Sequence, residues 1–220
     1  MSPHNPEETT MDIAIPMYDR FPALDAIGPY EVLSRLPGAQ VTWLAHEPGL
    51  VRTDNGMLAI EATAAFEDLP SPDIVLVPGG TGTRDLLDDE RLMNWLRRAH
   101  ETSTWTTSVC TGSLLLGAAG ILDGLRATGH WLELEPLAGY GATPTSERVV
   151  FEGKVVTAAG VSSGIDMGLA LAGRIAGDDY AKAIQLLIEY DPQPPYDTGS
   201  TAKAGPELTE LVRSRVASFR

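Results

Sequence analysis

Cysteine is almost absent from this sequence: among 220 residues there is one, Cys110. A lone thiol cannot form a disulfide within its own chain, which excludes the disulfide-stapled folds of small secreted domains. We therefore expect the protein to work in a reducing compartment, the cytoplasm. Any thiol chemistry of this chain depends on Cys110.

Positive charge is also scarce, with 16 Lys and Arg residues against 30 Asp and Glu residues and a formal net charge of −14. A surface that binds nucleic acid needs clustered cations to replace the counterions of the phosphates. This composition therefore disfavours a nucleic-acid partner.

Long apolar runs are missing as well. No stretch of the sequence approaches the roughly 20 apolar residues of a membrane-spanning helix, so we expect no membrane association. The opening segment, MSPHNPEETT, has neither the basic nor the apolar region of a signal peptide. We predict that residues 1–10 form a disordered leader ahead of one domain, residues 11–220.

The sequence also lacks motifs for phosphate and metal binding. Neither the GxGxxG spacing nor the Walker A spacing occurs. No His, Cys, Asp or Glu residues with ligand-like spacing surround Cys110. We expect neither a metal nor an organic cofactor.

What the sequence does contain is an alternation of short apolar runs with amphipathic segments. This alternation is typical of an α/β domain with a mostly parallel sheet. The predicted strands cover residues 11–17, 41–45, 73–77 and 104–109, with hairpins over 50–63 and 148–158. The predicted helices cover residues 25–36, 90–101, 112–119, 164–175, 179–190 and, with a polar surface, 207–219.

Cys110 stands at the end of the predicted strand 104–109, and the small-residue helix 112–119 follows it closely. A strand that ends at a reactive residue and turns sharply into a helix is a nucleophile elbow. The N–H groups and the partial positive charge of a helix N-terminus lower the pKa of a thiol, so we expect a thiolate. Free cysteine is often a buried packing residue, but this context favours a nucleophile, which could also be oxidised.

Gly79 and Gly80 directly follow the buried strand 73–77. Binding sites of parallel sheets form at the carboxyl ends of strands, and glycine lets backbone N–H groups approach a ligand closely. We predict that Gly79, Gly80 and the Thr111 N–H form an oxyanion hole, with a plain connecting turn as the alternative for the glycines.

Two ionisable residues are candidate partners for the thiol. Asp25 begins a helix after the first strand, where it is either an N-cap or a general acid/base whose pKa is raised by burial and by a thiolate. His130 precedes Trp131 and is either a packed structural histidine or the base that activates Cys110. The residues alone leave both alternatives open.

Six segments in order carry a resemblance to a known superfamily: LDAIGP (24–29), VPGGTG (77–82), SVCTGSLLLGAAGIL (108–122), RATGHW (126–131), ERVV (147–150) and GIDM (164–167). They resemble the ThiJ/PfpI superfamily and, with LIEYDPQPPYDTGS (187–200), its isonitrile hydratase subgroup. The resemblance implies the class I glutamine-amidotransferase-like, flavodoxin-like fold. That fold is a single-domain three-layer α/β sandwich with a nucleophile elbow.

The resemblance also implies roles for individual residues. Cys110 matches the family nucleophile, Asp25 an acidic residue near the sulfur, and Thr111 a threonine that the hydratases require. The Thr111 hydroxyl would orient Asp25 or the attacking water, and Gly79 and Gly80 match glycines whose backbone faces the site. The implied reaction is hydration of an isonitrile to an N-substituted formamide through a cysteine thioimidate, in a homodimer that needs no cofactor.

The chain departs from this pattern at Gly129, because relatives often have ATTHW where this sequence has ATGHW. The missing hydroxyl would change the pocket and the substrate range. Peptidase members of the superfamily carry a histidine directly after the nucleophile, so Thr111 disfavours a peptidase. The alternatives to the hydratase are another superfamily enzyme, such as a glyoxalase or deglycase, and a non-catalytic ligand- or redox-sensing module.

Overall fold

The structure is a computed structural model that describes residues 10–217. The predicted leader, residues 1–10, lies outside the described residues except for Thr10. The chain divides into two compact units, Met1–Ile188 and Glu189–Arg220. The predicted domain, residues 11–220, includes parts of both units and stays a prediction.

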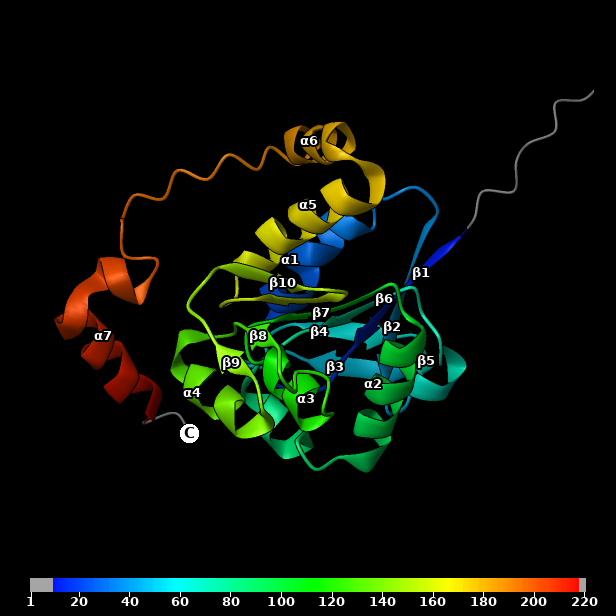
Figure 1. The fold of residues 1–220 in the computed structure, drawn as a ribbon, viewed down its shortest axis with the longest axis horizontal. Coiled ribbons are helices and arrows are strands. Elements are labelled where there is room, and N and C mark those ends of the chain that lie inside the picture. The colour runs from blue at the N-terminus through cyan, green and yellow to red at the C-terminus, as the bar shows by residue number, and fades with distance from the viewer. Residues whose placement is uncertain (1–9, 218–220) are drawn as a thin grey trace, which may run out of the picture. The chain divides into compact units, whose positions relative to one another are not determined.

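A seven-stranded sheet forms the centre of the first unit (Figure 1). Its strand order is β10-β11-β7-β6-β1-β2-β5, and all neighbours pair in parallel except β10 and β11. The strands are β1 (Met11–Pro16), β2 (Ala39–Ala45), β5 (Ala64–Ala65), β6 (Ile74–Val77), β7 (Trp105–Val109), β10 (Val149–Glu152) and β11 (Val155–Ala158). The predicted α/β fold with a mostly parallel sheet is confirmed.

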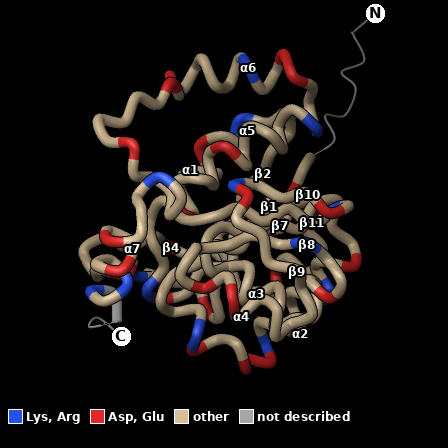
Figure 2. Tube along the Cα trace, turned by 60° about the vertical axis from the view of Figure 1, so that its left-hand side comes forward, with Lys and Arg blue, Asp and Glu red and all other residues tan. Residues whose placement is uncertain are grey.

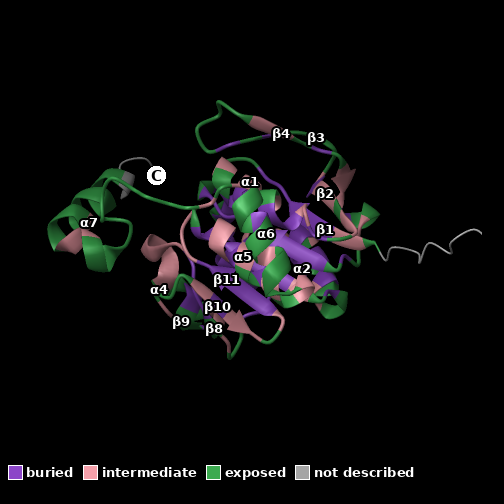
Figure 3. Ribbon diagram, turned by 90° about the horizontal axis from the view of Figure 1, so that it is seen from above, coloured by how far each residue is buried: buried purple, intermediate pink, exposed green. Residues whose placement is uncertain are grey.

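The strands bury both faces of the sheet and so build two apolar cores. Ile13 and Ile15 of β1 belong to one core, and Ala14 between them belongs to the other, because neighbouring strand residues point to opposite faces. Figure 3 shows the buried strands enclosed by helices. The first core contains residues of α1 (Ala23–Leu33) and α5 (Ser163–Ala176), and the second contains residues of α2 (Glu90–Thr102) and α3 (Gly112–Ala118). This is a three-layer sandwich.

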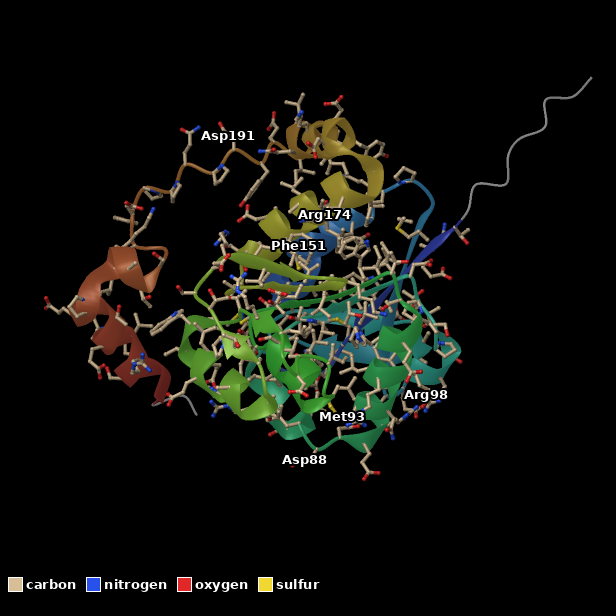
Figure 4. All side chains as sticks on the ribbon, viewed as in Figure 1. Asp88, Met93, Arg98, Phe151, Arg174 and Asp191 are labelled. Atoms are coloured by element: carbon tan, nitrogen blue, oxygen red, sulfur yellow. The ribbon has the colours of Figure 1, made fainter. Side chains whose placement is uncertain are left out.

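Arg174 near the end of α5 covers the edge strand β10. Its guanidinium carbon lies 4.1 Å from the centroid of the Phe151 ring, and Figure 4 labels both side chains. A cation so close to an aromatic face is attracted by the electrons of the ring. The contact fixes the last turn of α5 to the edge of the sheet.

The first predicted hairpin is confirmed. Its strands β3 (Gly49–Arg52) and β4 (Ala59–Ala62) pair antiparallel on either side of Asp54, Asn55 and Gly56. Some helix ends differ from prediction, since α1 begins two residues before Asp25. The remaining short elements of this unit are β8 (Arg126–Ala127), β9 (Thr143–Pro144), α4 (Leu134–Leu137), α6 (Asp178–Leu187) and the 3-10 turns 66–68, 81–86, 131–133 and 138–140.

The second unit consists mainly of α7 (Thr201–Ala217). The helix is broken at Gly205, whose φ of 75° is not helical, and Pro206 follows the break. The predicted helix 207–219 corresponds to the part after this break, and residues 218 and 219 lie outside the described residues.

No helix in the described range 10–217 is long and apolar enough to cross a membrane. Figure 2 shows Lys and Arg scattered among Asp and Glu along the chain rather than collected on one element.

Candidate active site

Three loops meet at the carboxyl ends of β1, β6 and β7. β1 leads to Asp25, β6 to Gly79 and Gly80, and β7 to Cys110. β1 and β6 are neighbours, and the chain continues from them toward opposite edges of the sheet. Open parallel sheets form their ligand sites at such a switch point. The fold thus brings the main sequence-predicted residues to one place.

Cys110 occupies a sharp, strained turn between β7 and α3. Its φ is 59°, a conformation that L residues rarely adopt, and its side chain is 4% exposed. Its N–H donates to the carbonyls of Ala158 and Ala159, at 3.1 and 2.9 Å. A Cβ on Gly112 would lie 2.3 Å from the Val77 oxygen, so only glycine lets α3 begin this close to β6. The predicted sharp turn from strand to helix at Cys110 is confirmed, and the role of Cys110 as a nucleophile stays a prediction.

Asp25 lies fully buried in the first turn of α1 with its carboxyl beside Cys110. Its Oδ2 accepts the Gly79 N–H at 2.9 Å, and its buried Oδ1 has no hydrogen-bond partner among the described residues. Burial raises the pKa of Asp25 to about 7; the Gly79 N–H and the Cys110 side chain lower it, and the charge of Asp54 raises it. The direction agrees with the expected effect of burial, whereas Cys110 lowers this pKa instead of raising it. The N-cap alternative is wrong, because Pro22 holds that position and the Asp25 side chain points into the site.

The thiol of Cys110 contradicts the prediction of an easily formed thiolate. Its pKa is raised well above the ordinary value, mainly by burial and then by the charge of Asp25. Hydrogen bonds from the N–H groups of Thr111 and Val161 lower this pKa but do not overcome burial. The prediction considered only the helix N-terminus and omitted desolvation. Because two buried acids repel each other when both are ionised, the pair retains one proton at neutral pH.

Gly79 and Gly80 tie the loops together with the N–H groups that were predicted to bind an oxyanion. The Gly79 N–H donates to Asp25, and the Gly80 N–H donates to Thr111 Oγ1 at 2.7 Å. The Thr111 hydroxyl in turn donates to the Gly80 carbonyl at 3.1 Å. Both glycine N–H groups are thus paired within the protein, and the oxyanion hole of Gly79, Gly80 and the Thr111 N–H stays a prediction. The Thr111 hydroxyl likewise holds Gly80 rather than Asp25.

The need for glycine at position 79 has a steric reason. A Cβ there would lie 2.5 Å from the Thr111 nitrogen and 2.9 Å from Asp25 Oδ2. Gly79 therefore lets the β6 loop contact both the elbow and α1. The backbone N–H groups of Thr111 and Val161, which point at the Cys110 sulfur, are the donors that could stabilise an anion there.

His130 lies half-buried at the edge of this group. Its Nδ1 accepts the Leu132 N–H at 3.3 Å, so the neutral ring carries its proton on Nε2. Burial lowers its pKa, and Glu133 opposes that effect. The ring packs on Gly160, where a Cβ would lie 2.9 Å from His130 Cδ2. Within residues 10–217 no hydrogen bond joins His130 to Cys110, so the structure favours the packing role over a Cys–His pair.

Gly129, at which the sequence resemblance implied a departure from the family pattern, lies against the elbow. A Cβ at this position would lie 2.5 Å from Ser113 Oγ and 2.9 Å from the Cys110 carbonyl oxygen. The Ser113 hydroxyl donates to that carbonyl at 3.2 Å. The space next to Gly129 is thus filled by a hydroxyl from α3.

Sequence reasoning missed two contributors to the site. Val161 follows β11 in a loop without a distinctive motif, and only the fold brings its N–H to the sulfur. Tyr18 follows the end of β1 by two residues, and its hydroxyl donates to the Pro78 carbonyl at 2.5 Å. A polar residue at the end of a buried strand was the available signal for Tyr18.

Metal ligands do not gather at this site. Among the described residues no three His, Cys, Asp or Glu side chains are arranged to hold a metal ion. The groups that the structure brings together are a thiol, a carboxyl, a tyrosine hydroxyl and backbone N–H groups. Such a set can carry out nucleophilic addition with proton transfer.

Known proteins resemble this chain in sequence and in fold. Residues 11–174 match the DJ-1/PfpI family. The chain is 40% identical to the isonitrile hydratase of Pseudomonas putida over 207 residues, which cover 94% of this chain and 90% of the relative. It is 28% identical to the HTH-type transcriptional regulator CdhR of Pseudomonas aeruginosa, over 77% of this chain and 51% of the regulator.

A solved structure shares the fold nearly throughout. The crystal structure of a ThiJ/PfpI family protein from Pseudomonas syringae matches with a TM-score of 0.91 and 35% identity, covering 100% of this chain and 93% of that one. The fold that the sequence resemblance implied is therefore confirmed.

Proposed function

This chain belongs to the DJ-1/PfpI family, and on that premise we propose that it is an isonitrile hydratase that converts R–N≡C and water into R–NH–CHO. The observation that carries the proposal is the pair of buried groups, the Cys110 thiol and the Asp25 carboxyl, which shift each other's pKa; the pKa of Asp25 is raised to about 7. The 40% identity to the Pseudomonas putida isonitrile hydratase supports the substrate class.

The shape of the substrate suits the burial of the sulfur. The reactive carbon of an isonitrile is the end of a narrow linear group, while amides and 2-oxoaldehydes present a planar carbonyl with substituents. With Cys110 only 4% exposed, a terminal carbon reaches the sulfur through a narrower opening than a carbonyl carbon needs. The burial of the Cys110 sulfur therefore favours a hydratase over a glyoxalase or deglycase.

The first chemical step uses the proton that the pair retains. In the reactive form the proton is on Asp25 and Cys110 is a thiolate. The Asp25 carboxyl transfers its proton to the terminal isonitrile carbon while the sulfur forms a bond to the same carbon. The product is a thioimidate, R–N=CH–S, on Cys110, and Asp25 is left as the carboxylate.

The second step consumes water. The Asp25 carboxylate takes a proton from water as the oxygen adds to the thioimidate carbon, and that proton passes to the nitrogen. The adduct R–NH–CH(OH)–S then loses its hydroxyl proton to Asp25 as the C–S bond breaks. This releases the formamide and restores the thiolate and the protonated carboxyl. The N–H groups of Thr111 and Val161 stabilise the departing sulfur.

The assay is direct. Purified protein is incubated with cyclohexyl or p-tolyl isocyanide, and the formamide is measured by chromatography, with conversion of methylglyoxal to lactate as the comparison reaction. We expect isonitrile turnover by the wild type, none by Cys110→Ala, and a loss of about 100-fold or more in Asp25→Asn. No turnover by the wild type, or full turnover by Cys110→Ala, would contradict the proposal.

A second candidate is a ligand-sensing module, favoured by the 28% identity to the regulator CdhR. In that case the protein would bind a small molecule at the same site without turnover. The sensing module would be identified if calorimetry detects binding of an isonitrile while the product assay detects no formamide.

We also propose that the enzyme works as a homodimer in the cytoplasm. Large apolar side chains on the described surface, such as Met57 at 88% and Leu186 at 78% exposure, support a covered interface. The single free thiol favours a reducing compartment. Light scattering after gel filtration measures the assembly, and a monomer at micromolar concentration would argue against the dimer.

A further inference from the structure

Tyr18 is a buried, ionisable residue that the mechanism above does not use. It lies two residues after the end of β1 with 7% of its surface exposed. Its ring packs into the core beneath the site, where a Cβ on Gly82 would lie 3.2 Å from Tyr18 Cδ2. The hydroxyl is therefore held in one direction by the packing of its ring.

That hydroxyl binds the peptide group that contacts the proton carrier. The Tyr18 O–H donates to the Pro78 carbonyl at 2.5 Å, and the N–H of the same peptide, on Gly79, donates to Asp25 Oδ2 at 2.9 Å. A peptide group is planar, so fixing its carbonyl also fixes the direction of its N–H. A donor on the carbonyl also polarises the peptide and strengthens the hydrogen bond that its N–H makes.

The position of this peptide matters because it contacts the elbow as well. The Pro78 oxygen would lie 2.8 Å from a Cβ on Gly112, the first residue of α3. The peptide Pro78–Gly79 is thus enclosed by Tyr18, α3 and Asp25. Rotation of this one peptide would withdraw the N–H from the carboxyl that is paired with Cys110.

We propose that Tyr18 is a positioning residue for the proposed hydration, because its hydroxyl holds the Pro78–Gly79 peptide so that the Gly79 N–H supports the Asp25 carboxylate beside Cys110. Its part in turnover rests on the function proposed above. The hydroxyl acts as a permanent donor rather than as an acid or base. Burial and the charges of Asp25 and Cys110 raise its pKa well above the ordinary value, so it stays protonated.

The groups that face Asp25 determine what loss of this hydroxyl does. They are the Cys110 thiol from the elbow, the Gly79 N–H from the β6 loop and the charge of Asp54 from the β3–β4 hairpin. The Gly79 hydrogen bond lowers the pKa of Asp25, so weakening it raises that pKa. The charge of the Asp25 carboxylate raises the pKa of the Cys110 thiol, so a carboxyl that keeps its proton to higher pH lets the Cys110 thiolate form at lower pH.

The test is the pH dependence of alkylation at Cys110, which is the single cysteine of the sequence. The rate of modification by iodoacetamide is measured across pH for the wild type, Tyr18→Phe and the control Tyr140→Phe. The Tyr140 ring packs on Gly117 of α3, so the control removes a hydroxyl from a ring that contacts the helix after the elbow. We expect the profile to move to lower pH in Tyr18→Phe alone, with thermal unfolding measured to show that both variants fold.

Turnover gives the second readout. If the hydratase assay succeeds, Tyr18→Phe should lower kcat by about 10-fold or more, because misplacement of a proton carrier slows the chemical step. An alkylation profile that stays unchanged in folded Tyr18→Phe overturns the inference, whatever the activity. A shifted profile in a protein that never converts isonitriles supports the role of Tyr18 and contradicts the proposed function instead.

Discussion

At the scale of single residues, the site depends on two acidic groups that burial holds back from ionisation. Asp25 and Cys110 could be predicted from the sequence, because Cys110 directly follows a strand rich in β-branched residues and Asp25 lies at the predicted start of a helix after the apolar strand β1. The raised pKa of the thiol could not be predicted, because local sequence indicates a helix N-terminus but gives no measure of desolvation. The partners of Gly79, Gly80 and Thr111 were also missed, since they lie far apart in sequence and meet only in the fold.

Burial of Asp25 predicts how stability depends on pH. Folding raises the pKa of this carboxyl from 3.8 to about 7, so the folded state binds more protons than the unfolded state between these values. The contribution of Asp25 to stability is therefore present below about pH 4 and is lost as the pH rises to about 7, by up to about 4 kcal/mol. Urea unfolding at several pH values measures it, and Asp25→Asn should flatten this part of the curve.

Other carboxyls titrate in the same range, so the difference between the two proteins is the relevant quantity. A wild type and an Asp25→Asn variant with parallel stability curves between pH 4 and pH 7 would show that Asp25 is not held protonated.

Gly129 and Ser113 form a second residue-scale prediction. Gly129→Ala would press a Cβ against Ser113 Oγ at 2.5 Å, so it should destabilise the protein by about 1–3 kcal/mol. In a Ser113→Ala background the hydroxyl is gone, and the nearest atom of residue 113 to the added Cβ is the Cβ of that residue, at 3.7 Å. Part of the cost should therefore disappear, as a double-mutant cycle on unfolding free energies measures.

The added Cβ would still lie 2.9 Å from the Cys110 carbonyl oxygen, so Ser113→Ala should remove only part of the loss in unfolding free energy. Equal costs of Gly129→Ala in both backgrounds would mean that Ser113 does not fill the space beside Gly129.

At the scale of elements, the sequence predicted the strands that carry the site, but it did not predict the short strands and helices around them. β1, β6 and β7 are continuous apolar or β-branched runs that end in chemically distinctive residues, so their ends were found within a residue or so. The pair β8–β9 and helix α4 are two to four residues long, too short for periodicity to reveal. Helix α1 begins at Ala23, two residues before its predicted start at Asp25, and Pro29 lies inside it.

The connection after β6 gives an element-scale prediction. Gly80 has φ of 126°, and a Cβ on it would lie 2.3 Å from the Arg20 carbonyl oxygen, so Gly80→Ala should cost about 2 kcal/mol or more and misplace Thr111. Gly139→Ala is the matched control, because nothing lies within 4 Å of its added Cβ. Thermal unfolding of both variants checks the prediction, which fails if the two behave alike.

At the scale of the whole molecule, both apolar cores belong to the first unit. Every buried residue in the two cores precedes Glu189. Among the residues whose burial the structure describes, the second unit contributes none of the side chains in these two cores. Sequence patterns indicated the helix 207–219 but not this division, because core membership depends on contacts distant in sequence.

Removal of residues 189–220 tests that division. We expect the shortened chain to unfold cooperatively, with a midpoint within a few degrees of the full chain, because its cores are complete. Calorimetry of both proteins is the measurement. Loss of the cooperative transition would show that the second unit is needed for the fold.

The central claim is that Cys110 forms a covalent thioimidate on the way to the formamide. Its most direct test is mass spectrometry of the protein mixed with cyclohexyl isocyanide and quenched with acid during turnover. We predict a mass increase equal to one isonitrile molecule, located on the peptide that contains Cys110 and absent from Cys110→Ala. Formamide released at the wild-type rate by Cys110→Ala, or turnover with no adduct on this peptide at any time, would contradict the account.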